Sequence, residues 1–292
     1  MSEDLMRIYA DLDDTPVTRE AYVRSPFNYP GNKRESLEQI LPLLPSGDVF
    51  VDVFGGTGII TLNRRPSKLD VFNDRWAGIV AFYRCIRDPI LLDQLTERIK
   101  LCVHAREEFM WCKATWENCQ DDVERAARWY YMVQTSFACR GKFFGRILGP
   151  STPISRKIFE NLECFAEVHQ RFQDVQVENL DFRECFKDYD SPTTVFYCDP
   201  PYYENNIYAV GFTKQDHLEL LDKIFKAKGF VALSGYMNEA YSKMPWDNIH
   251  SWDRKDKMAT MATKTETSVV AGREDMDTRS DKIEYLWIKE AY

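Results

Sequence analysis

DVFVDVFGGTG, residues 48–58, joins a short run of β-branched and aromatic residues to a cluster of glycines. A run of this kind is typical of a buried strand, and the glycines allow the tight turn that follows it. The stretch therefore predicts the strand at which a doubly wound α/β sheet starts.

Runs of the same kind lie downstream, at residues 68–73, 175–180, 193–198 and 230–233. Helical patterns separate most of them, and this alternation favours a mostly parallel sheet. A last strand-like run at 283–288 follows the polar stretch 257–281. We expect that stretch to be a mobile loop and the last strand to pair antiparallel, in a hairpin.

Residues 91–174 differ from the rest of the chain, because they hold amphipathic helical patterns and no convincing strand. Two of these patterns are Glu124–Thr135 and Ile158–Phe172. The expected parts of the chain are an acidic N-terminal segment (1–22), an α/β domain (23–90 and 175–292) and a helical insertion (91–174).

The net charge of −8 argues against a protein that coats nucleic acid nonspecifically, because neutralising phosphates requires clustered lysine and arginine. The distribution of charge is nevertheless uneven. Residues 138–159 contain no Asp or Glu, but they contain Arg140, Lys142, Arg146, Arg156 and Lys157. This segment predicts a local basic patch on an acidic body.

The sequence has no apolar run typical of a signal peptide or a membrane span, and its first twenty residues carry six acids. We therefore expect a cytoplasmic protein. Its eight cysteines are scattered singly, without CxxC pairs or a histidine at metal-ligand spacing. We expect reduced thiols, mostly in the core, and neither a structural zinc nor another metal.

The strongest single motif is Asp199–Tyr202 (DPPY), which directly follows a predicted strand. Open α/β sheets bind ligands beyond the carboxyl ends of their strands. The amino group of a nucleic-acid base is a poor nucleophile, and it improves when two acceptors hold its hydrogens. Asp199 and the backbone carbonyl of Pro200 can be these acceptors, since the turn through Pro201 is rigid. Tyr202 can stack on a base extruded from a duplex. The alternative is an ordinary Pro-Pro turn beside a packed tyrosine.

The glycine turn begins at an acid, Asp52. It lacks the Gly-Lys-Ser/Thr ending of a phosphate-binding P-loop, and the acid favours a cationic ligand such as the sulfonium of S-adenosylmethionine. Asp74 follows the second predicted strand about twenty residues later, where a carboxylate can accept both hydroxyls of a ribose. The alternative role for Asp74 is to cap the helix expected near Trp76.

These motifs and their order resemble the Dam-like (alpha-group) adenine-N6 DNA methyltransferases of bacteria and phages. The matching segments are FNYPGNK (27–33), DVFGGTG (52–58), Asn73–Asp74, Asp181–Phe182 and DPPY (199–202). The basic insertion lies between the glycine turn and DPPY, as in that family. The resemblance implies a Rossmann-like methyltransferase sheet, a helical target-recognition insertion, and methyl transfer from S-adenosylmethionine to N6 of a flipped adenine in duplex DNA.

The same resemblance implies contacts to the cofactor. Tyr29 and Lys33 would meet its methionine end, with the Lys33 ammonium on the carboxylate. Asp74 would hold the ribose, while Asp181 and Phe182 would bind and sandwich the adenine. The remaining residues expected to bind the cofactor lie in the same motifs: Gly31, Asn32, Asp52, Phe54, Gly55, Gly56 and Gly58.

The basic patch resembles the family's hairpin that enters the duplex beside the target base. Arg140 aligns with the arginine expected there and is the candidate base reader. The other candidate DNA contacts are Lys142, Arg146, Arg156 and Lys157. CRGKFFGR (139–146) replaces the family's usual residues, so GATC specificity does not carry over. A solvated basic loop is the alternative interpretation.

Other activities are compatible with DPPY chemistry, namely methylation of cytosine N4 in DNA or of adenine in RNA. A catalytically inactive DNA-binding module is a further alternative. A C5-cytosine enzyme is excluded, because that reaction needs a thiolate on a Pro-Cys loop and the sequence has no Pro-Cys.

We expect a monomer that associates with the nucleoid when it acts on double-stranded DNA. A cognate restriction endonuclease is a candidate partner in a restriction-modification system.

Overall fold

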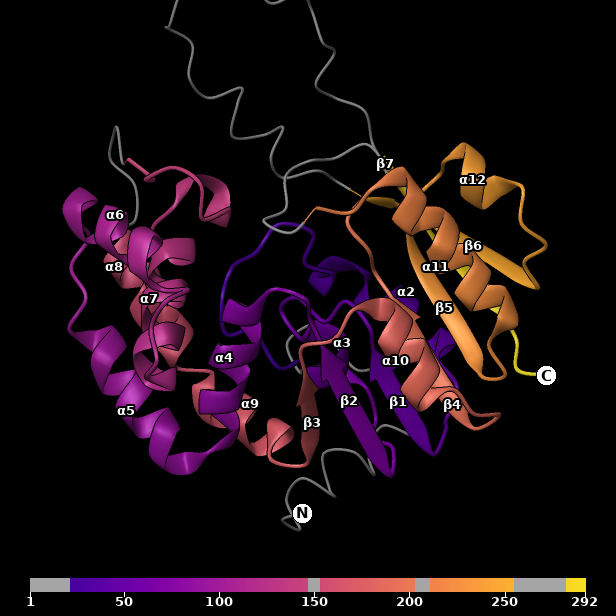
Figure 1. The fold of residues 1–292 in the computed structure, drawn as a ribbon, viewed down its shortest axis with the longest axis horizontal. Coiled ribbons are helices and arrows are strands. Elements are labelled where there is room, and N and C mark those ends of the chain that lie inside the picture. Colours follow the sequence, from indigo (N-terminus) through magenta and orange to yellow (C-terminus); the bar gives the residue numbers. More distant parts are fainter. Residues whose placement is uncertain (1–21, 147–152, 203–210, 255–281) are drawn as a thin grey trace, which may run out of the picture.

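The computed structural model describes residues 22–146, 153–202, 211–254 and 282–292. Within these residues the centre of the fold is a seven-stranded sheet in the order β3-β2-β1-β4-β5-β7-β6 (Figure 1). The strands are β1 (Val49–Asp52), β2 (Leu69–Asn73), β3 (Val175–Glu178), β4 (Thr194–Cys198), β5 (Phe230–Tyr236), β6 (Asn248–Arg254) and β7 (Lys282–Lys289). The first five pair in parallel, whereas β7 pairs antiparallel with both β5 and β6.

The central strand β1 is buried on both faces of the sheet. Successive side chains of a strand point to opposite faces. Phe50 accordingly packs in one hydrophobic cluster with Val195, while Val51 packs in another with Val71 and Phe196. Burial on both faces explains why these strands are nearly continuous apolar runs.

Helices cover each face of the sheet. The cluster around Val51 is closed by α10 (Phe182–Tyr189) and α11 (Lys214–Lys226), and the cluster around Phe50 by α2 (Leu37–Ile40) and α3 (Ile59–Asn63). Both α10 and α11 begin with a capping box, which fixes where each helix starts. The predicted doubly wound, mostly parallel sheet with a C-terminal antiparallel strand is confirmed.

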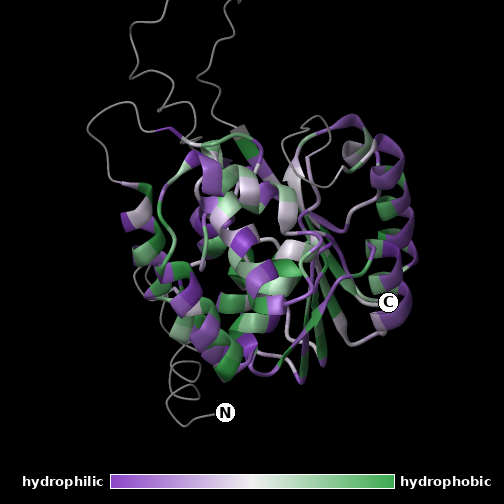
Figure 2. Cartoon of the chain, turned by 60° about the vertical axis from the view of Figure 1, so that its left-hand side comes forward, coloured by the Kyte–Doolittle hydropathy of each residue, from purple (hydrophilic) through white to green (hydrophobic). Residues whose placement is uncertain are grey.

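A group of helices lies beside β3 at one edge of the sheet (Figure 1). Its members are α4 (Ala77–Arg87), α5 (Pro89–Lys100), α6 (Arg106–Thr115), α7 (Asp122–Gln134), α8 (Ile154–Leu162) and α9 (Phe165–Phe172). Hydrophobic and hydrophilic bands alternate along these helices (Figure 2), and their apolar faces meet in an aromatic core. In that core the Phe82 and Tyr130 rings stack with centroids 5.4 Å apart.

Two expectations from the sequence were wrong in detail. The helix expected at 158–172 is two helices, α8 and α9, because the chain turns at Cys164, whose backbone N–H bonds to the carbonyl of Asn161. The strand β6 was not predicted, since an edge strand such as NIHSWDR carries polar residues that hide the alternation. The short helix α12 (Glu239–Ser242) precedes it.

The acidic segment and the polar stretch 257–281 fall, apart from Tyr22, outside the described residues. Among the residues that are described, no helix has the length and hydropathy needed to cross a membrane. All eight cysteines are free, and Cys85, Cys112, Cys164, Cys185 and Cys198 are buried.

Candidate active site

The turn after β1 brings backbone to the edge of a pocket. Gly56 and Gly58 have φ angles of 53° and 66°, a left-handed conformation that only glycine adopts without strain. The Gly55 N–H donates to the carbonyl of Asn73 at 2.7 Å. A Cβ added at Gly55 would lie 2.2 Å from the Phe72 ring. The glycines are therefore required for the turn to close against β2.

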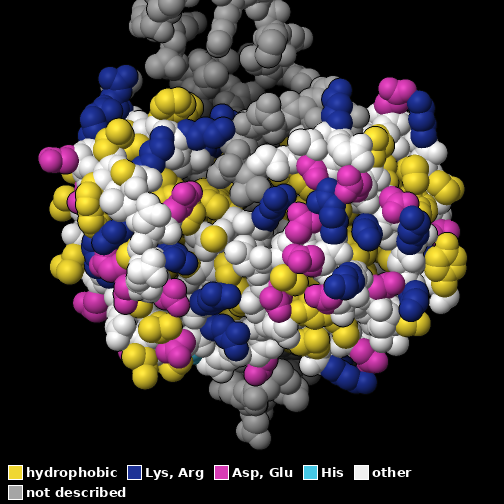
Figure 3. Space-filling model, in the orientation of Figure 1, with side chains coloured by type: hydrophobic (Ala, Val, Ile, Leu, Met, Phe, Trp, Pro, Cys, Tyr) yellow, Lys and Arg dark blue, Asp and Glu magenta, His cyan; other side chains and the backbone are white. Residues whose placement is uncertain are grey.

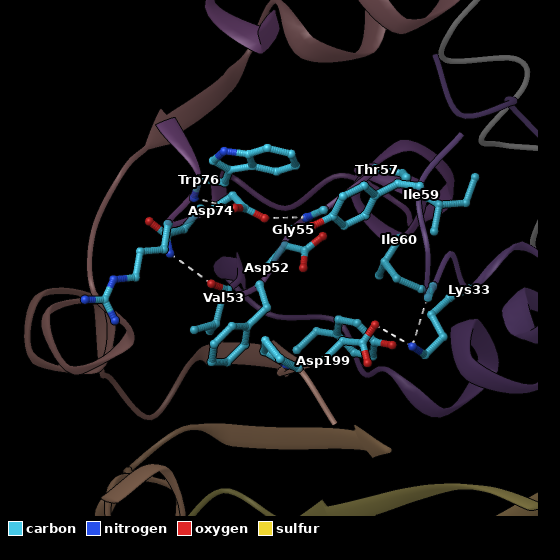
Figure 4. Close-up of a pocket in the computed structure, with 18 of the residues that line it drawn as sticks. Lys33, Asp52, Val53, Gly55, Thr57, Ile59, Ile60, Asp74, Trp76 and Asp199 are labelled. Carbon is cyan, nitrogen blue, oxygen red and sulfur yellow. Dashed lines mark hydrogen bonds and ion pairs between the residues drawn. The ribbon is translucent and has the colours of Figure 1, made fainter. Parts of the chain in front are cut away.

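The pocket lies at the carboxyl ends of β1, β2 and β4, where open α/β sheets bind ligands. Most residues expected to bind the cofactor line it: Tyr29, Gly31, Asn32, Lys33, Asp52, Phe54, Gly55, Gly56, Asp74 and Phe182. Asp199 and Pro201 of the DPPY turn also line it. Of the residues expected to bind the cofactor or to act in catalysis, those that do not line it are Gly58, Asp181, Pro200 and Tyr202. Figure 4 shows Asp52 between Asp74 and the pair formed by Asp199 and Lys33.

Asp74 stands at the end of β2 with both carboxylate oxygens engaged. One accepts a hydrogen bond from the Trp76 N–H at 2.7 Å, and the other accepts from the Gly56 N–H at 2.9 Å. The N-cap of α4 is Trp76, so Asp74 does not cap this helix, and its bond to the Trp76 N–H only fixes the chain that leads into it. A carboxylate has about four acceptor sites, so Asp74 can still accept hydroxyl groups. Burial raises its pKa to about 6, against the two N–H donors that lower it.

Asp52 is buried at the centre of the site. One carboxylate oxygen accepts from the Thr61 hydroxyl at 2.8 Å, and the other has no hydrogen-bond partner within the described part of the chain. Burial raises the pKa of Asp52 to about 7, although the Thr61 hydrogen bond opposes this shift. An unsatisfied buried carboxylate favours a cation or a hydrogen-bond donor in the pocket.

Aromatic rings form the walls of the pocket. The centroids of Phe54, Phe182 and Phe212 lie between 5.5 and 6.1 Å from one another. Across the pocket, Tyr29 packs on Trp76 at 5.8 Å. Such walls can hold a flat heterocyclic ring by stacking and edge contacts.

The adjacent Asp181 caps α10 and forms ion pairs with Arg183 at 2.9 Å and with Arg75 at 3.3 Å. Its expected contact to an adenine remains a prediction.

Asp199 is held on both sides of its carboxylate. Its Oδ2 accepts from the Lys33 ammonium group, and its Oδ1 accepts from the Ser234 hydroxyl at 3.0 Å. Lys33 also donates to the Gly31 carbonyl and to the Tyr202 hydroxyl, both at 3.2 Å. Burial raises the pKa of Asp199, and the Lys33 charge lowers it.

Sequence reasoning expected Lys33 to meet the carboxylate of the cofactor, whereas in this structure its ammonium group contacts Asp199. Burial alone would lower the pKa of Lys33, but the acidic groups around it, of which Asp199 is the strongest, hold it well above its ordinary value. Lys33 is therefore a buried cation beside the DPPY turn. The ring of Tyr202 packs on Tyr236 with centroids 4.4 Å apart.

The sequence reasoning missed other groups at this end of the pocket. Ser234 lies in β5 and Tyr197 in β4, and the Tyr197 hydroxyl donates to Ser234 at 3.1 Å. Glu284 of β7 is wholly buried and lies 3.3 Å from the Lys33 ammonium. Its signal in the sequence was an acid inside the otherwise apolar run at 283–288.

Arg140 and Lys142 lie in a tight turn, and as far as Arg146, where the described residues break off, it is closed by one β-bridge and not by an extended hairpin. A single bridge joins Ser136 to Phe144, and the Phe137 N–H donates to the Phe143 carbonyl at 2.7 Å. Phe137 and Phe143 are 66% and 74% exposed. A Cβ at Gly141 would lie 3.7 Å from the ring of Trp76. The turn is therefore next to the mouth of the pocket.

The candidate DNA contacts differ in burial. Arg140 is half-buried, and its Nε has no hydrogen-bond partner within the described residues. Lys142 and Arg146 are exposed, as are Arg156 and Lys157 in α8. Arg156 lies 3.6 Å from Glu160, one turn along the helix. In Figure 3, Lys and Arg side chains gather beside hydrophobic ones at the upper end of the helical group.

The parallel sheet, the glycine turn and the DPPY turn meet at one pocket at the carboxyl ends of the strands. The chain belongs to the D12 class N6 adenine-specific DNA methyltransferase family, whose sequence model matches residues 29–258. The resemblance seen in the motifs is therefore confirmed.

Curated relatives agree with this family. The type II methyltransferase M.FokI of Planomicrobium okeanokoites is 26% identical over 199 residues, which are 62% of this chain and 29% of M.FokI. The DNA N-6-adenine-methyltransferase of Escherichia phage P1 is 26% identical, over 62% of this chain and 24% of the phage protein. The type II methyltransferase M.CviBI of Paramecium bursaria Chlorella virus NC1A is 24% identical, over 79% of this chain and 94% of M.CviBI. The chain thus matches less than a third of the length of the first two relatives.

Proposed function

We propose that this chain transfers a methyl group from S-adenosylmethionine to N6 of an adenine that is flipped out of duplex DNA. The observation that carries the proposal is the position of Asp199. Its carboxylate lies at the end of β4, lines the pocket that also contains Asp52 and Asp74, and is held by Lys33 and Ser234. An acceptor for the amino group thus stands beside a pocket suited to the methyl donor.

The residues of the pocket fit S-adenosylmethionine. The unsatisfied oxygen of Asp52 suits a positively charged ligand, and Asp74 has acceptor sites left for ribose hydroxyls. The rings of Phe54, Phe182 and Phe212 suit the adenine. When bound, this cofactor supplies an activated methyl group on a positively charged sulfur. Among the described residues no group of three His, Cys, Asp or Glu side chains is arranged to hold a metal ion.

The DPPY turn acts on the amino group of the target base. Asp199 and the carbonyl of Pro200 accept its two hydrogens and turn its lone pair towards the methyl group, which raises its nucleophilicity as the transition state forms. Tyr202, already packed on Tyr236, offers a face for the flipped base. After the transfer the nitrogen loses a proton, and Asp199 is the acceptor within reach.

Residues 91–174 form the target-recognition part in this proposal, and the turn around Arg140 is the element that meets the duplex. Its exposed basic residues can bind phosphates. The exposed rings of Phe137 and Phe143 can contact bases or sugars beside the extruded nucleotide. We further propose that the protein works as a monomer on chromosomal or phage DNA in the cytoplasm, with a restriction endonuclease as a candidate partner.

Adenine in DNA is favoured over cytosine N4 and over RNA because the matching family and the relative from phage P1 are both named for N6-adenine methylation of DNA. The test is to express the protein in a host without DNA methylation and to sequence the host DNA with a readout that locates N6-methyladenine. We expect N6-methyladenine at one short sequence. Modified cytosine, or unmodified DNA with methylated RNA, would instead support one of the alternatives.

A further inference from the structure

Glu284 is an acid enclosed by the sheet and by the segment before β1. It is 0% exposed and pairs in register with Tyr236 of β5 and Trp252 of β6. Its Oε2 accepts a hydrogen bond from the Ser36 hydroxyl at 3.2 Å, and its Oε1 lies 3.3 Å from the ammonium of Lys33. A buried acid at such a position is costly unless it is paired.

Lys33 is shared between two carboxylates. Its side chain is 3% exposed, and it contacts Asp199, which is 18% exposed, as well as Glu284. When both carboxyls carry their charge, one cation between them leaves the cluster of Asp199, Lys33 and Glu284 with one excess negative charge. Without Glu284, the pair of Lys33 and Asp199 would be neutral.

That excess charge matters for the reaction proposed above. As the bond from the amino nitrogen to the methyl carbon forms, the bond from sulfur to that carbon breaks. The sulfonium becomes a neutral thioether, and the positive charge moves to the amino nitrogen until its proton passes to Asp199. An unbalanced Lys33 ammonium beside Asp199 would oppose this charge, whereas a net negative cluster stabilises it.

We propose that Glu284 is a positioning residue of the methyl transfer: it holds Lys33 as a shared cation and keeps the cluster around Asp199 negatively charged where positive charge develops on the amino nitrogen. This inference rests on the proposed function. Glu284 acts through Lys33 and touches neither the base nor the cofactor in this account.

The electrostatic surroundings of Asp199 support the inference. Burial raises the pKa of Asp199, Lys33 lowers it, and Glu284 raises it again. Asp52 in β1 and Tyr197 and Cys198 in β4 also interact electrostatically with Asp199, and Tyr202 interacts with Lys33. The substitution Glu284→Gln leaves all of these in place, so it should lower the pKa of Asp199 and make the cluster neutral.

The test compares the parent protein with Glu284→Gln, with Glu284→Asp, and with the control Glu290→Gln, which removes an exposed acid just after β7. Single-turnover methylation of duplex DNA is measured against pH at saturating S-adenosylmethionine. Thermal unfolding reports whether each variant is folded. The Asp199 carboxyl is also titrated by carbon-13 NMR without cofactor, and its signal is assigned by its loss in Asp199→Asn.

We expect Glu284→Gln to be roughly tenfold slower or more. On acidification, the rate of Glu284→Gln should fall with a midpoint at lower pH than the rate of the parent. The midpoint of the Asp199 titration by NMR should also move to lower pH. Glu284→Asp keeps the charge and should keep most of the rate and the parental midpoint, while Glu290→Gln should match the parent.

A folded Glu284→Gln protein with the parental rate or the parental Asp199 midpoint would overturn the inference. So would Glu284→Asp being as slow as Glu284→Gln, because packing rather than charge would then be the cause. If the parent itself methylates no DNA, the proposed function fails, and the NMR titration still decides whether Glu284 controls the charge on Asp199.

Discussion

The ammonium group of Lys33 lies against the carboxylate of Asp199, although 166 positions separate the two residues in the chain. Lys33 precedes the first strand of the sheet and Asp199 follows the fourth, so only the completed parallel sheet brings them together. Their contact joins the FNYPGNK segment to the DPPY turn. The protein's own side chains, Lys33 and Ser234, therefore hold the carboxylate that we propose as the acceptor for the target base.

Replacing Asp199 by Asn tests the acceptor directly. Asparagine keeps the size and one acceptor oxygen but loses the charge and adds a donor, so the single-turnover rate should fall at least about a hundredfold. The affinity for S-adenosylmethionine, measured by calorimetry, should stay within about tenfold. A variant that keeps near-normal turnover contradicts the mechanism.

Removing the Asp74 carboxylate should weaken cofactor binding. Asp74→Ala loses charged hydrogen bonds to two hydroxyls, which are together worth about 1.5 to 3 kcal/mol. The matched control is Asp88→Ala, because Asp88 also accepts hydrogen bonds from two backbone N–H groups, as the N-cap of α5, but does not line the pocket. Unchanged affinity in Asp74→Ala would mean that Asp74 serves only the backbone of Gly56 and Trp76.

Cofactor binding should weaken as the pH falls. Burial raises the pKa of Asp52 to about 7 and that of Asp74 to about 6, so both acids gain protons between neutral and mildly acidic pH. A cationic ligand binds the ionised forms better. Calorimetry between pH 8 and about pH 5.5 should show this loss of affinity. In Asp52→Asn the affinity for the cofactor should depend less on pH. A pH-independent affinity in the parent would contradict this role of the two acids.

The same shifts affect the stability of the free protein. Because the pKa values of Asp52 and Asp74 are higher in the folded state, the folded chain binds more protons than the unfolded chain between about pH 4 and pH 7. Their contribution to the free energy of unfolding is therefore largest below that window and is lost as the pH rises through it. In denaturant titrations, the free energy of unfolding of Asp52→Asn should therefore decrease less than that of the parent as the pH rises through this window.

The basic turn should make two kinds of contact with DNA. Lys142→Ala and Arg146→Ala should each make the plot of log affinity against log salt concentration less steep, by roughly one unit of slope. Each should also weaken binding to all DNA sequences about equally. Arg140→Ala should in addition reduce the difference in binding free energy between cognate and near-cognate sites by about 1 to 3 kcal/mol. Lys187→Ala, an exposed lysine in α10, is the control. If all three variants keep the parental slope and discrimination, the turn is a solvated loop.

The fold was predictable where burial leaves a signal in the sequence. Strands such as β1 and β4 are buried on both faces and form continuous apolar runs. In the edge strand β6, residues 248–253 are exposed or half-buried, so its sequence could not be distinguished from a polar loop. The break between α8 and α9 was also hidden, because apolar residues continue at helical spacing through the turn at Cys164.

Residues that line the pocket could be predicted from the sequence where they lie within a short local motif, as Asp74 does in Asn73–Asp74. Ser234 and Glu284 belong to no such motif, since they reach the DPPY turn only through the pairing of β5 with β4 and β7. The contact between Lys33 and Asp199 was missed for the same reason. Long-range strand pairing decides which side chains meet, and local patterns do not contain it.

The most direct test of the proposed function is to measure which nucleoside the protein methylates. Duplex DNA is incubated with S-adenosylmethionine and either the parent protein or Asp199→Ala, then digested to nucleosides and analysed by mass spectrometry. We predict N6-methyladenine as the product of the parent protein, no product from Asp199→Ala, and cofactor binding in both. Methylated cytosine from the parent, or N6-methyladenine formed by Asp199→Ala at the parental rate, would contradict it.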